Sequence, residues 1–193
     1  MMDESLMRTS GVPGLDPVLG GGYRTGARII VYGSPLSGIE ILAARFAEAT
    51  GGVYLSLDEE PVGQAFAAAG LSVEDIAHDI RGPSAVLDSL SSVILDRGIS
   101  QAIRLLTIAT DSFRSEGGCL LCTLYEGLHT PYEEILIFRQ ADIVIYLRTE
   151  VHQSQVERRL QVMKYRGMRI PDRTVPFILT GDGIELSTTS RVV

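Results

Sequence analysis

The sequence predicts an α/β fold in which helices flank a mostly parallel sheet and antiparallel strands form its C-terminal edge. Three observations lead to this prediction. Short apolar runs alternate with segments of helical spacing along most of the chain. A loop that carries Gly33 and Gly38 joins the first apolar run to the first helical segment. Two final strand-like runs, separated by Gly181-Asp182-Gly183, have the pattern of a closing hairpin.

Apolar spacing and turn residues define the elements of the first half. After an apolar run over 29–32, which we expect to be a strand, Ile39, Leu42 and Phe46 recur on one helical face. Gly51-Gly52 separates this helix from the next strand. The other elements expected here are a strand over 53–57, an alanine-rich helix over 64–69, a short helix capped by Ser72 and a strand over 83–88.

The second half continues the alternation and then changes character. Ile103, Leu106 and Phe113 predict a helix over 101–116, which Gly117-Gly118 ends. The remaining elements expected are a strand over 119–124, a helix over 132–139, strands over 143–147 and 159–166, and a hairpin over 177–186. Strands that follow one another at the end of such a chain predict an antiparallel edge on a parallel sheet.

Length and composition limit the class of protein. A chain of 193 residues is the size of one domain, which we expect over 1–193, and such a domain buries about 70% of its unfolded surface. The net charge of −7 argues against general nucleic-acid binding. No apolar run approaches the roughly 20 residues of a membrane helix, and residues 1–10 lack the apolar core of a signal peptide. We therefore expect a cytoplasmic protein with no membrane partner.

Cysteine and histidine do not indicate a metal site. Cys119 and Cys122 have the spacing of a C-x-x-C motif, but they lie in an apolar run that is predicted to be a buried strand. Residues three apart on a strand face opposite sides, so these thiols are expected to pack in the core. His78, His129 and His152 are scattered, and surface or capping roles are expected for each.

The most informative stretch lies between the first strand and the first helix. Phosphate-binding loops carry two glycines five residues apart, followed by lysine and then by serine or threonine. Here the glycines fit, whereas Ile39 stands at the lysine position and Glu40 at the hydroxyl position. The candidate cofactor-binding residues of this loop are Gly33, Ser34, Pro35, Ser37, Gly38, Ile39 and Glu40. The loop has the frame of an ATP site without the side chains that hold phosphate and magnesium.

The size of the missing interactions indicates how much affinity is lost. A charge-assisted hydrogen bond from lysine to phosphate contributes about 1.5–3 kcal/mol, and Ile39 cannot make one. A carboxylate about 4 Å from a phosphate oxygen costs about 4 kcal/mol at an effective dielectric constant of about 20. A loss of that size weakens binding about a thousandfold. Another lysine close in the sequence cannot replace the missing contact to phosphate, because Lys164 is the only lysine of the chain.

Two interpretations of the loop remain open. It is either a strand-to-helix turn that binds nothing, or a former ATP site that is kept as a scaffold or has changed its ligand. Leu36 adds a steric obstacle to phosphate binding, because such loops often have glycine where the backbone approaches a phosphate closely.

Several motifs along the chain occur together in one order. Thr9-Ser10-Gly11-Val12-Pro13-Gly14-Leu15-Asp16 and Leu19-Gly20-Gly21-Gly22-Tyr23-Arg24-Thr25-Gly26 precede the loop. Leu55-Ser56-Leu57-Asp58-Glu59-Glu60-Pro61, Val86-Leu87-Asp88-Ser89-Leu90 and Lys164-Tyr165-Arg166-Gly167 follow it. This series resembles the KaiC-like branch of RecA-type (ASCE-type) P-loop ATPases over nearly the whole chain. The resemblance implies a RecA-like fold with ATP bound between the subunits of a hexameric ring.

The resemblance also implies roles for particular residues. Asp58 and Glu59 match the acidic pair that activates water, and Asp88 matches the Walker B carboxylate that holds magnesium. Lys164 and Arg166 match a pair that reaches the nucleotide of a neighbouring subunit. These roles agree with the needs of phosphoryl transfer, which depends on positioned cations and an oriented water.

This chain departs from the family pattern in two places. Its phosphate loop lacks the lysine and the hydroxyl, and the stretch between the acidic pair and Asp88 is short. Simpler interpretations also stay open for the other motifs. Asp58, Glu59 and Glu60 fit an ordinary strand-end turn, and Asp88 fits a helix cap. The basic stretch over 158–173 fits a solvated edge, a subunit contact or, last, a nucleic-acid patch, because no aromatic-rich loop accompanies it.

The sequence therefore favours a KaiC-like protein that has lost competent ATPase chemistry and acts in regulation or as a scaffold. The first alternative is an ATPase or switch that still binds ATP and magnesium, or that supplies Lys164 and Arg166 to a partner ATPase. The second is a recombinase-like accessory protein that binds DNA. The expected partners are further copies of this chain or a related ATPase, and no resident cofactor or metal is expected.

Overall fold

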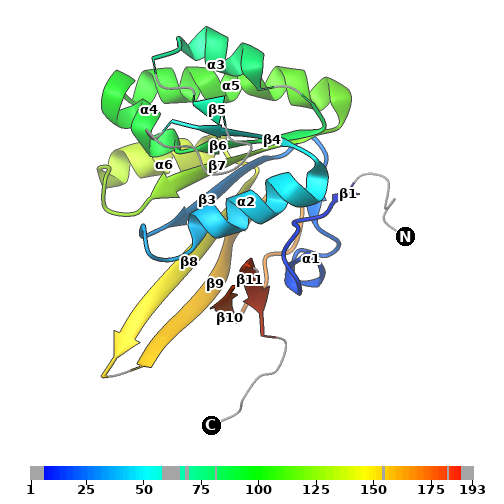
Figure 1. Ribbon diagram of the computed structural model, residues 1–193, viewed down its shortest axis with the longest axis vertical. Helices are drawn as coiled ribbons and strands as arrows, with labels where there is room; N and C mark the ends of the chain where they lie inside the picture. Colours follow the sequence, from blue (N-terminus) through cyan, green and yellow to red (C-terminus); the bar gives the residue numbers. More distant parts are fainter. Residues whose placement is uncertain are drawn as a thin grey trace.

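The computed structural model describes residues 7–57, 66–67, 70–80, 82–153, 155–181 and 183–187. Its centre is a nine-stranded sheet in the order β11-β10-β9-β8-β3-β7-β6-β4-β5 (Figure 1). The strands of this sheet are β3 (Arg28–Gly33), β4 (Val53–Ser56), β5 (Phe66–Ala67), β6 (Ser84–Asp88), β7 (Cys119–Tyr125), β8 (Ile143–His152), β9 (Gln155–Tyr165), β10 (Val175–Thr180) and β11 (Gly183–Leu186). A separate two-stranded sheet pairs β1 (Met7–Arg8) with β2 (Tyr23–Arg24).

The directions of the strands confirm the predicted fold class. β3 pairs in parallel with β7 and β8, and β6 pairs in parallel with β7 and β4. β9, β10 and β11 then follow as an antiparallel edge. The carboxyl ends of the parallel strands therefore meet along one edge of the sheet, which we call the carboxyl edge. Their amino ends meet along the opposite edge, which we call the amino edge.

Helices cover both faces of this sheet. They are α1 (Leu15–Val18), α2 (Ile39–Thr50), α3 (Val73–Asp79), α4 (Leu90–Arg97), α5 (Ile99–Glu116) and α6 (Pro131–Gln140). In Figure 1, α2 lies on one side of the sheet and the layer of α3, α4 and α5 on the other. Each face has its own apolar core, one built with α1 and α2 and the other with α3 to α6.

The alternation of side chains along β3 explains why there are two cores. Ile29 and Val31 pack in the core under α2, whereas Ile30 and Tyr32 pack in the opposite one. Neighbouring residues of a strand point to opposite faces, so a continuous apolar run supplies both cores at once. Cys119 and Cys122 of β7 divide in the same way, which confirms that they do not converge on one ion.

Most predicted elements are present. The sequence did not predict α1, α4 or the short strands β1 and β2, and two of the predicted elements differ from the structure. Phe66 and Ala67 lie within the predicted helix over 64–69, but they form β5 beside Leu55 and Ser56 of β4, so a helix across these two residues is wrong. Pairing with an open sheet edge outweighs the helical propensity of alanine there. The other residues of that range lie outside the described part of the chain.

The second difference is the length of the hairpin formed by β8 and β9. The prediction ended the first strand at residue 147, but β8 continues to His152. Leu147 is the last residue that pairs with β3, and beyond it β8 pairs with β9 alone. This two-stranded arm extends past the rest of the sheet (Figure 1).

Two capping boxes fix helix starts that the sequence indicates. The Ser72 hydroxyl accepts from the backbone N–H of Asp75 at the start of α3, as predicted. Thr130 accepts from Glu133 in the same way, and Pro131 takes the first position of α6. Such caps satisfy N–H groups that have no partner inside the helix.

Candidate functional site

The loop that carries Gly33 and Gly38 lies at the carboxyl edge and joins β3 to α2, as the sequence predicts for a strand followed by a helix. A Cβ atom on Gly33 would lie 2.5 Å from Ser37 Oγ and 2.6 Å from the carbonyl oxygen of Leu147. Gly38 has φ +92°, and a Cβ atom there would lie 2.8 Å from Leu179 Cδ2. Glycine is therefore required at both positions. A side chain at residue 33 would have no space, and at residue 38 the positive φ disfavours other residues in addition to the lack of space.

The polar groups inside this loop bind one another. The buried Ser37 hydroxyl donates to the carbonyl oxygen of Ser34 at 2.6 Å, and the Ser37 backbone N–H donates to the same oxygen at 3.0 Å. Pro35 and Leu36 form the exposed tip, where 82% of Leu36 is accessible to solvent. The loop is thus a closed turn whose tip carries an apolar side chain.

Ile39, at the lysine position, belongs to the core and is fully buried. It packs with other apolar residues of α2, including Leu42 and Phe46, in the core on that face of the sheet. The side chain at this position therefore contributes to the folding of the domain and offers no charge to a phosphate.

Glu40, at the hydroxyl position, is held by a tyrosine of the neighbouring strand. Its Oε1 accepts a hydrogen bond from the Tyr125 hydroxyl at 2.9 Å. Tyr125 is the last residue of β7, and its Cα pairs in register with that of Gly33. The parallel pairing of β3 and β7 therefore brings the first turn of α2 and the end of β7 together.

Asp88, the residue at the Walker B position, is a buried carboxylate at the end of β6. Its Oδ1 accepts from Thr123 Oγ1 at 2.6 Å, and its Oδ2 accepts from the Tyr54 hydroxyl at 2.6 Å. Burial raises the pKa of Tyr54, and the charge of Asp88, the hydrogen bond to it and the charge of Glu40 raise it further. The Tyr54 phenol therefore remains a donor.

These contacts form one cluster, which we call the carboxylate–hydroxyl network. Its members are Glu40, Tyr54, Asp88, Thr123 and Tyr125. Hydroxyl donors stabilise its two carboxylates beside the loop that joins β3 to α2. Because a hydrogen bond to a charged group contributes about 1.5–3 kcal/mol, the network stabilises the two carboxylates at the carboxyl edge.

His129 also contributes to this edge, where a surface or capping role was expected. Its Nε2 lies 2.8 Å from the buried Ser91 Oγ, which also accepts from the backbone N–H of Tyr125 at 2.9 Å. Burial lowers the pKa of His129, which favours the neutral ring. His129 therefore supports the backbone at the end of β7.

Two further tyrosine–carboxylate pairs lie on the other face of the sheet. The Tyr32 hydroxyl donates to Glu134 at 2.9 Å, and the Tyr146 hydroxyl donates to Glu126 at 2.8 Å. The rings of Tyr32 and Tyr146 lie 5.2 Å apart. Neither these tyrosines nor those of the network were among the site residues predicted from the sequence. For Tyr32, Tyr125 and Tyr146 the available signal is a tyrosine close to the carboxyl end of an apolar run, whereas Tyr54 lies near the start of its run.

Lys164 and Arg166 lie at the amino edge, away from the loop, because β9 runs antiparallel to β8. Lys164 Nζ donates to the carbonyl oxygens of Phe138 at 2.8 Å and Arg139 at 3.2 Å, near the end of α6. Burial lowers the pKa of Lys164, as does the neighbouring Arg166 charge. The structure therefore does not bring these two cations to the phosphate loop.

Asp142 connects three elements at this amino edge. Asp142 Oδ2 accepts hydrogen bonds from the backbone N–H of Arg28 at 3.0 Å and from Arg28 Nε at 3.2 Å. Asp142 Oδ1 lies 3.0 Å from Arg166 Nη1. Arg166 keeps 56% of its side chain exposed despite this ion pair. The exposed part remains accessible to another molecule.

The predicted catalytic pair, Asp58 and Glu59, lies outside the described residues. Within the part of the chain that the structure describes, no group of three His, Cys, Asp or Glu side chains has the arrangement of a metal site. None of the helices there combines the length and apolar character needed to cross a membrane.

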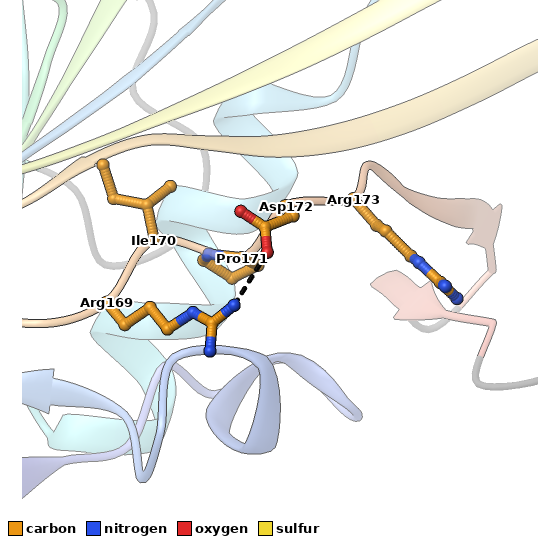
Figure 2. Close-up of a pocket in the computed structure, with 5 residues that line it drawn as sticks. All are labelled: Arg169, Ile170, Pro171, Asp172 and Arg173. Atoms are coloured by element: carbon orange, nitrogen blue, oxygen red, sulfur yellow. Dashed lines mark hydrogen bonds and ion pairs between the residues drawn. The ribbon is translucent and has the colours of Figure 1, made fainter.

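A shallow hollow of about 360 Å³ lies in the connection between β9 and β10. Figure 2 shows its five consecutive residues, with Arg169 and Asp172 paired at 2.9 Å and Arg173 turned away from them. One short segment forms all of its walls, so distant parts of the chain do not converge there. We therefore do not consider it a candidate site.

Comparison with known proteins agrees with the architecture. The chain matches a family of unknown function (DUF7125) over residues 7–192. It is 25% identical to the circadian clock protein KaiC2 of Synechocystis sp. (strain ATCC 27184 / PCC 6803 / Kazusa), an alignment that covers 92% of this chain and 38% of that protein. The chain thus spans well under half the length of this curated relative.

A solved structure has a similar fold. It is the crystal structure of a KaiC-like protein from the hyperthermophilic archaeon Pyrococcus horikoshii OT3, with a TM-score of 0.74 and 20% identity. The similarity covers 94% of this chain and 98% of that one. The chain therefore belongs to the family of unknown function (DUF7125), and its fold is that of the KaiC-like RecA proteins.

Proposed function

We propose that this protein is a catalytically impaired member of the KaiC-like group, which acts as a regulator or scaffold through contacts with other proteins. The observation that carries the proposal is the carboxylate–hydroxyl network together with the buried Ile39. These side chains stand where an ATPase needs a phosphate-binding cation and a hydroxyl ligand for magnesium.

The residues present do not fit a bound magnesium–ATP complex. Phosphoryl transfer depends on cations that neutralise the charge which develops on the transferred group. The helix after this loop begins with Ile39, which is apolar and fully buried, and Glu40 places a carboxylate in its first turn. The hydrogen bond between Glu40 and Tyr125 also holds that negative charge in place.

A second candidate is a switch that still binds nucleotide through backbone amides. The favouring observation is the retained backbone frame, in which Gly33 and Gly38 leave no space for a side chain. The N-terminus of α2 follows this frame, and helix N-termini attract anions. A related role is a contact in which the exposed part of Arg166 reaches the nucleotide of a partner ATPase.

Calorimetric titration with ATP, with and without magnesium, tests the proposal. We expect no measurable binding in either condition, since the estimated loss of affinity is about a thousandfold. Binding that magnesium strengthens would contradict impairment and support an active site. Binding without magnesium that Gly38→Ala abolishes would support the switch, and a matched Gly51→Ala variant, whose added Cβ meets nothing within 4 Å, serves as control.

A further inference from the structure

A second pocket lies at the amino edge of the sheet, which is the edge opposite to the one that carries the phosphate loop. It has a volume of about 400 Å³ and lies between the turn after β2, the start of β8 and the end of β9. We call it the amino-edge pocket, and the residues that matter for its chemistry are Arg24, Thr25, Gly26, Asp142, Arg166 and Gly167. Its volume is within the usual range of small-molecule sites, about 300–1,000 Å³.

The lining of this pocket carries more positive than negative charge. The guanidinium of Arg24 makes no hydrogen bond or ion pair with any residue in the described part of the chain. Arg166 is paired through Nη1 with Asp142, but that carboxylate also binds Arg28. Asp142 is therefore neutralised by its existing partners, and Arg24 adds an uncompensated charge to the pocket of a chain whose net charge is −7.

The backbone around the pocket is arranged so that the Arg24 side chain has room. Gly167 has φ +77°, and a Cβ atom there would lie 3.1 Å from Arg24 Nη1. Any other residue would strain the backbone and crowd the guanidinium. The Tyr165 hydroxyl donates to the carbonyl oxygen of Gly22 at 2.8 Å, which ties the end of β9 to the segment that leads into β2.

We propose that the amino-edge pocket binds a small anionic molecule through a carboxylate or phosphate group held between Arg24 and Arg166. Arginine is suited to this role because its planar fork donates two parallel hydrogen bonds to an oxyanion. The inference goes beyond the proposed function, because it assigns a ligand site at the edge that the former nucleotide loop does not reach.

The test is an NMR titration of the ¹⁵N-labelled full chain with inorganic phosphate and, separately, with succinate. The amide signals of Gly26 and Gly167 report on the pocket, and that of Gly38 reports on the phosphate loop. We expect saturable shifts at Gly26 and Gly167 with at least one probe and no shift at Gly38. The probe that binds more tightly identifies the preferred oxyanion.

Two variants decide which side chains are responsible. Arg24→Gln and Arg166→Gln are each expected to weaken binding at least tenfold. Arg169→Gln is the matched control, because Arg169 is 88% exposed and pairs with Asp172 outside the pocket (Figure 2), and it should bind like the wild type. Arg24 has no ion pair to lose, so its variant should keep the wild-type unfolding midpoint.

The proposal is overturned if neither probe gives saturable shifts, or if Arg24→Gln binds as tightly as the wild type. Saturable shifts confined to Gly38 would place the anion at the phosphate loop and overturn it as well. None of these results depends on whether the protein hydrolyses ATP, so the two proposals fail independently.

Discussion

At the position where a phosphate-binding loop has a hydroxyl, Glu40 carries a negative charge that the Tyr125 hydroxyl stabilises. Asp88 is stabilised by two further hydroxyls, from Tyr54 and Thr123. A carboxylate in partly buried surroundings needs such donors, because an unsatisfied buried polar group is strongly destabilising. The network therefore explains how two acidic residues are accommodated side by side at the carboxyl edge.

Removal of one donor should reveal this stabilisation. We expect Tyr54→Phe to lower the free energy of unfolding by about 1–3 kcal/mol, because Asp88 Oδ2 then loses its hydrogen bond. Tyr132→Phe is the matched control, since Tyr132 is 69% exposed and should change stability by less than about 0.5 kcal/mol. Urea denaturation measures both, and equal effects of the two variants would show that the Tyr54 hydroxyl contributes nothing.

The loop itself can be tested by restoring the family side chains. The double variant Ile39→Lys, Glu40→Thr gains a cation and loses a carboxylate, which should recover several kcal/mol of ATP binding, on the order of 3–6. Ile39→Met, Glu40→Thr is the control, because it removes the same carboxylate without adding the cation. Calorimetry should find tighter ATP binding in the lysine variant.

A folded lysine variant that binds ATP no better than its methionine control would show that further positions prevent binding. The exposed Leu36 at the tip of the loop is the first such position, and the contact of Leu179 with Gly38 is the second.

At the scale of elements, Asp142 joins the starts of β3 and β8 to the end of β9. Burial raises the pKa of Asp142, but the hydrogen bonds from Arg28 and the charges of Arg28 and Arg166 lower it by more, so the pKa lies below its usual value. The carboxyl group then binds protons more readily in the unfolded chain than in the folded one. Its contribution to stability is present above the ordinary pKa of about 3.9 and is lost as the pH falls through the lower folded value.

Asp142→Asn should therefore destabilise the protein at pH 6 by about 1–3 kcal/mol, and the difference from the wild type should shrink as the pH falls below about 4. Urea denaturation at several pH values measures this. Asp172→Asn, which removes an exposed pair with Arg169, should change stability by less than about 0.5 kcal/mol. A difference between wild type and Asp142→Asn that stays constant down to pH 2 would contradict this account of Asp142.

Local patterns in the sequence predicted most elements, because apolar spacing, glycines and caps act within a few residues. They failed at Phe66 and Ala67, where pairing with β4 decides the structure, and at the end of β8, whose last residues are stabilised by β9 and not by the core. The frame of the loop was predictable from Gly33 and Gly38. The tyrosine partners of Glu40 and Asp88 were not, because they come from strands that lie adjacent only in the folded sheet.

At the scale of the molecule, the two edges of the sheet carry different chemistry. The carboxyl edge holds the network of carboxylates and hydroxyls, while the amino edge holds Lys164, Arg166 and the neighbouring pocket. A residue at one edge cannot reach the other within the same chain. If Lys164 and Arg166 act on a loop of this kind, the loop belongs to another subunit.

We predict that Lys164 and Arg166 contribute to such a contact. The variant Lys164→Gln, Arg166→Gln should weaken self-association, or binding to a KaiC-like ATPase of the same cell, by about tenfold or more, as is common for arginine at interfaces. Sedimentation velocity of wild type and variant, alone and mixed with that ATPase, measures the effect, with Arg169→Gln as control. Identical sedimentation in all settings would leave this motif as an intrachain contact.

We infer that this protein keeps the frame of an ATPase site without its chemistry. Phosphate release by the purified protein, measured with ATP and magnesium over hours, is the decisive test. We predict a rate no higher than that of the Asp88→Asn variant, because the loop offers a buried isoleucine and a carboxylate where transfer needs a cation and a magnesium ligand. Steady magnesium-dependent phosphate release that Asp88→Asn abolishes would contradict the account.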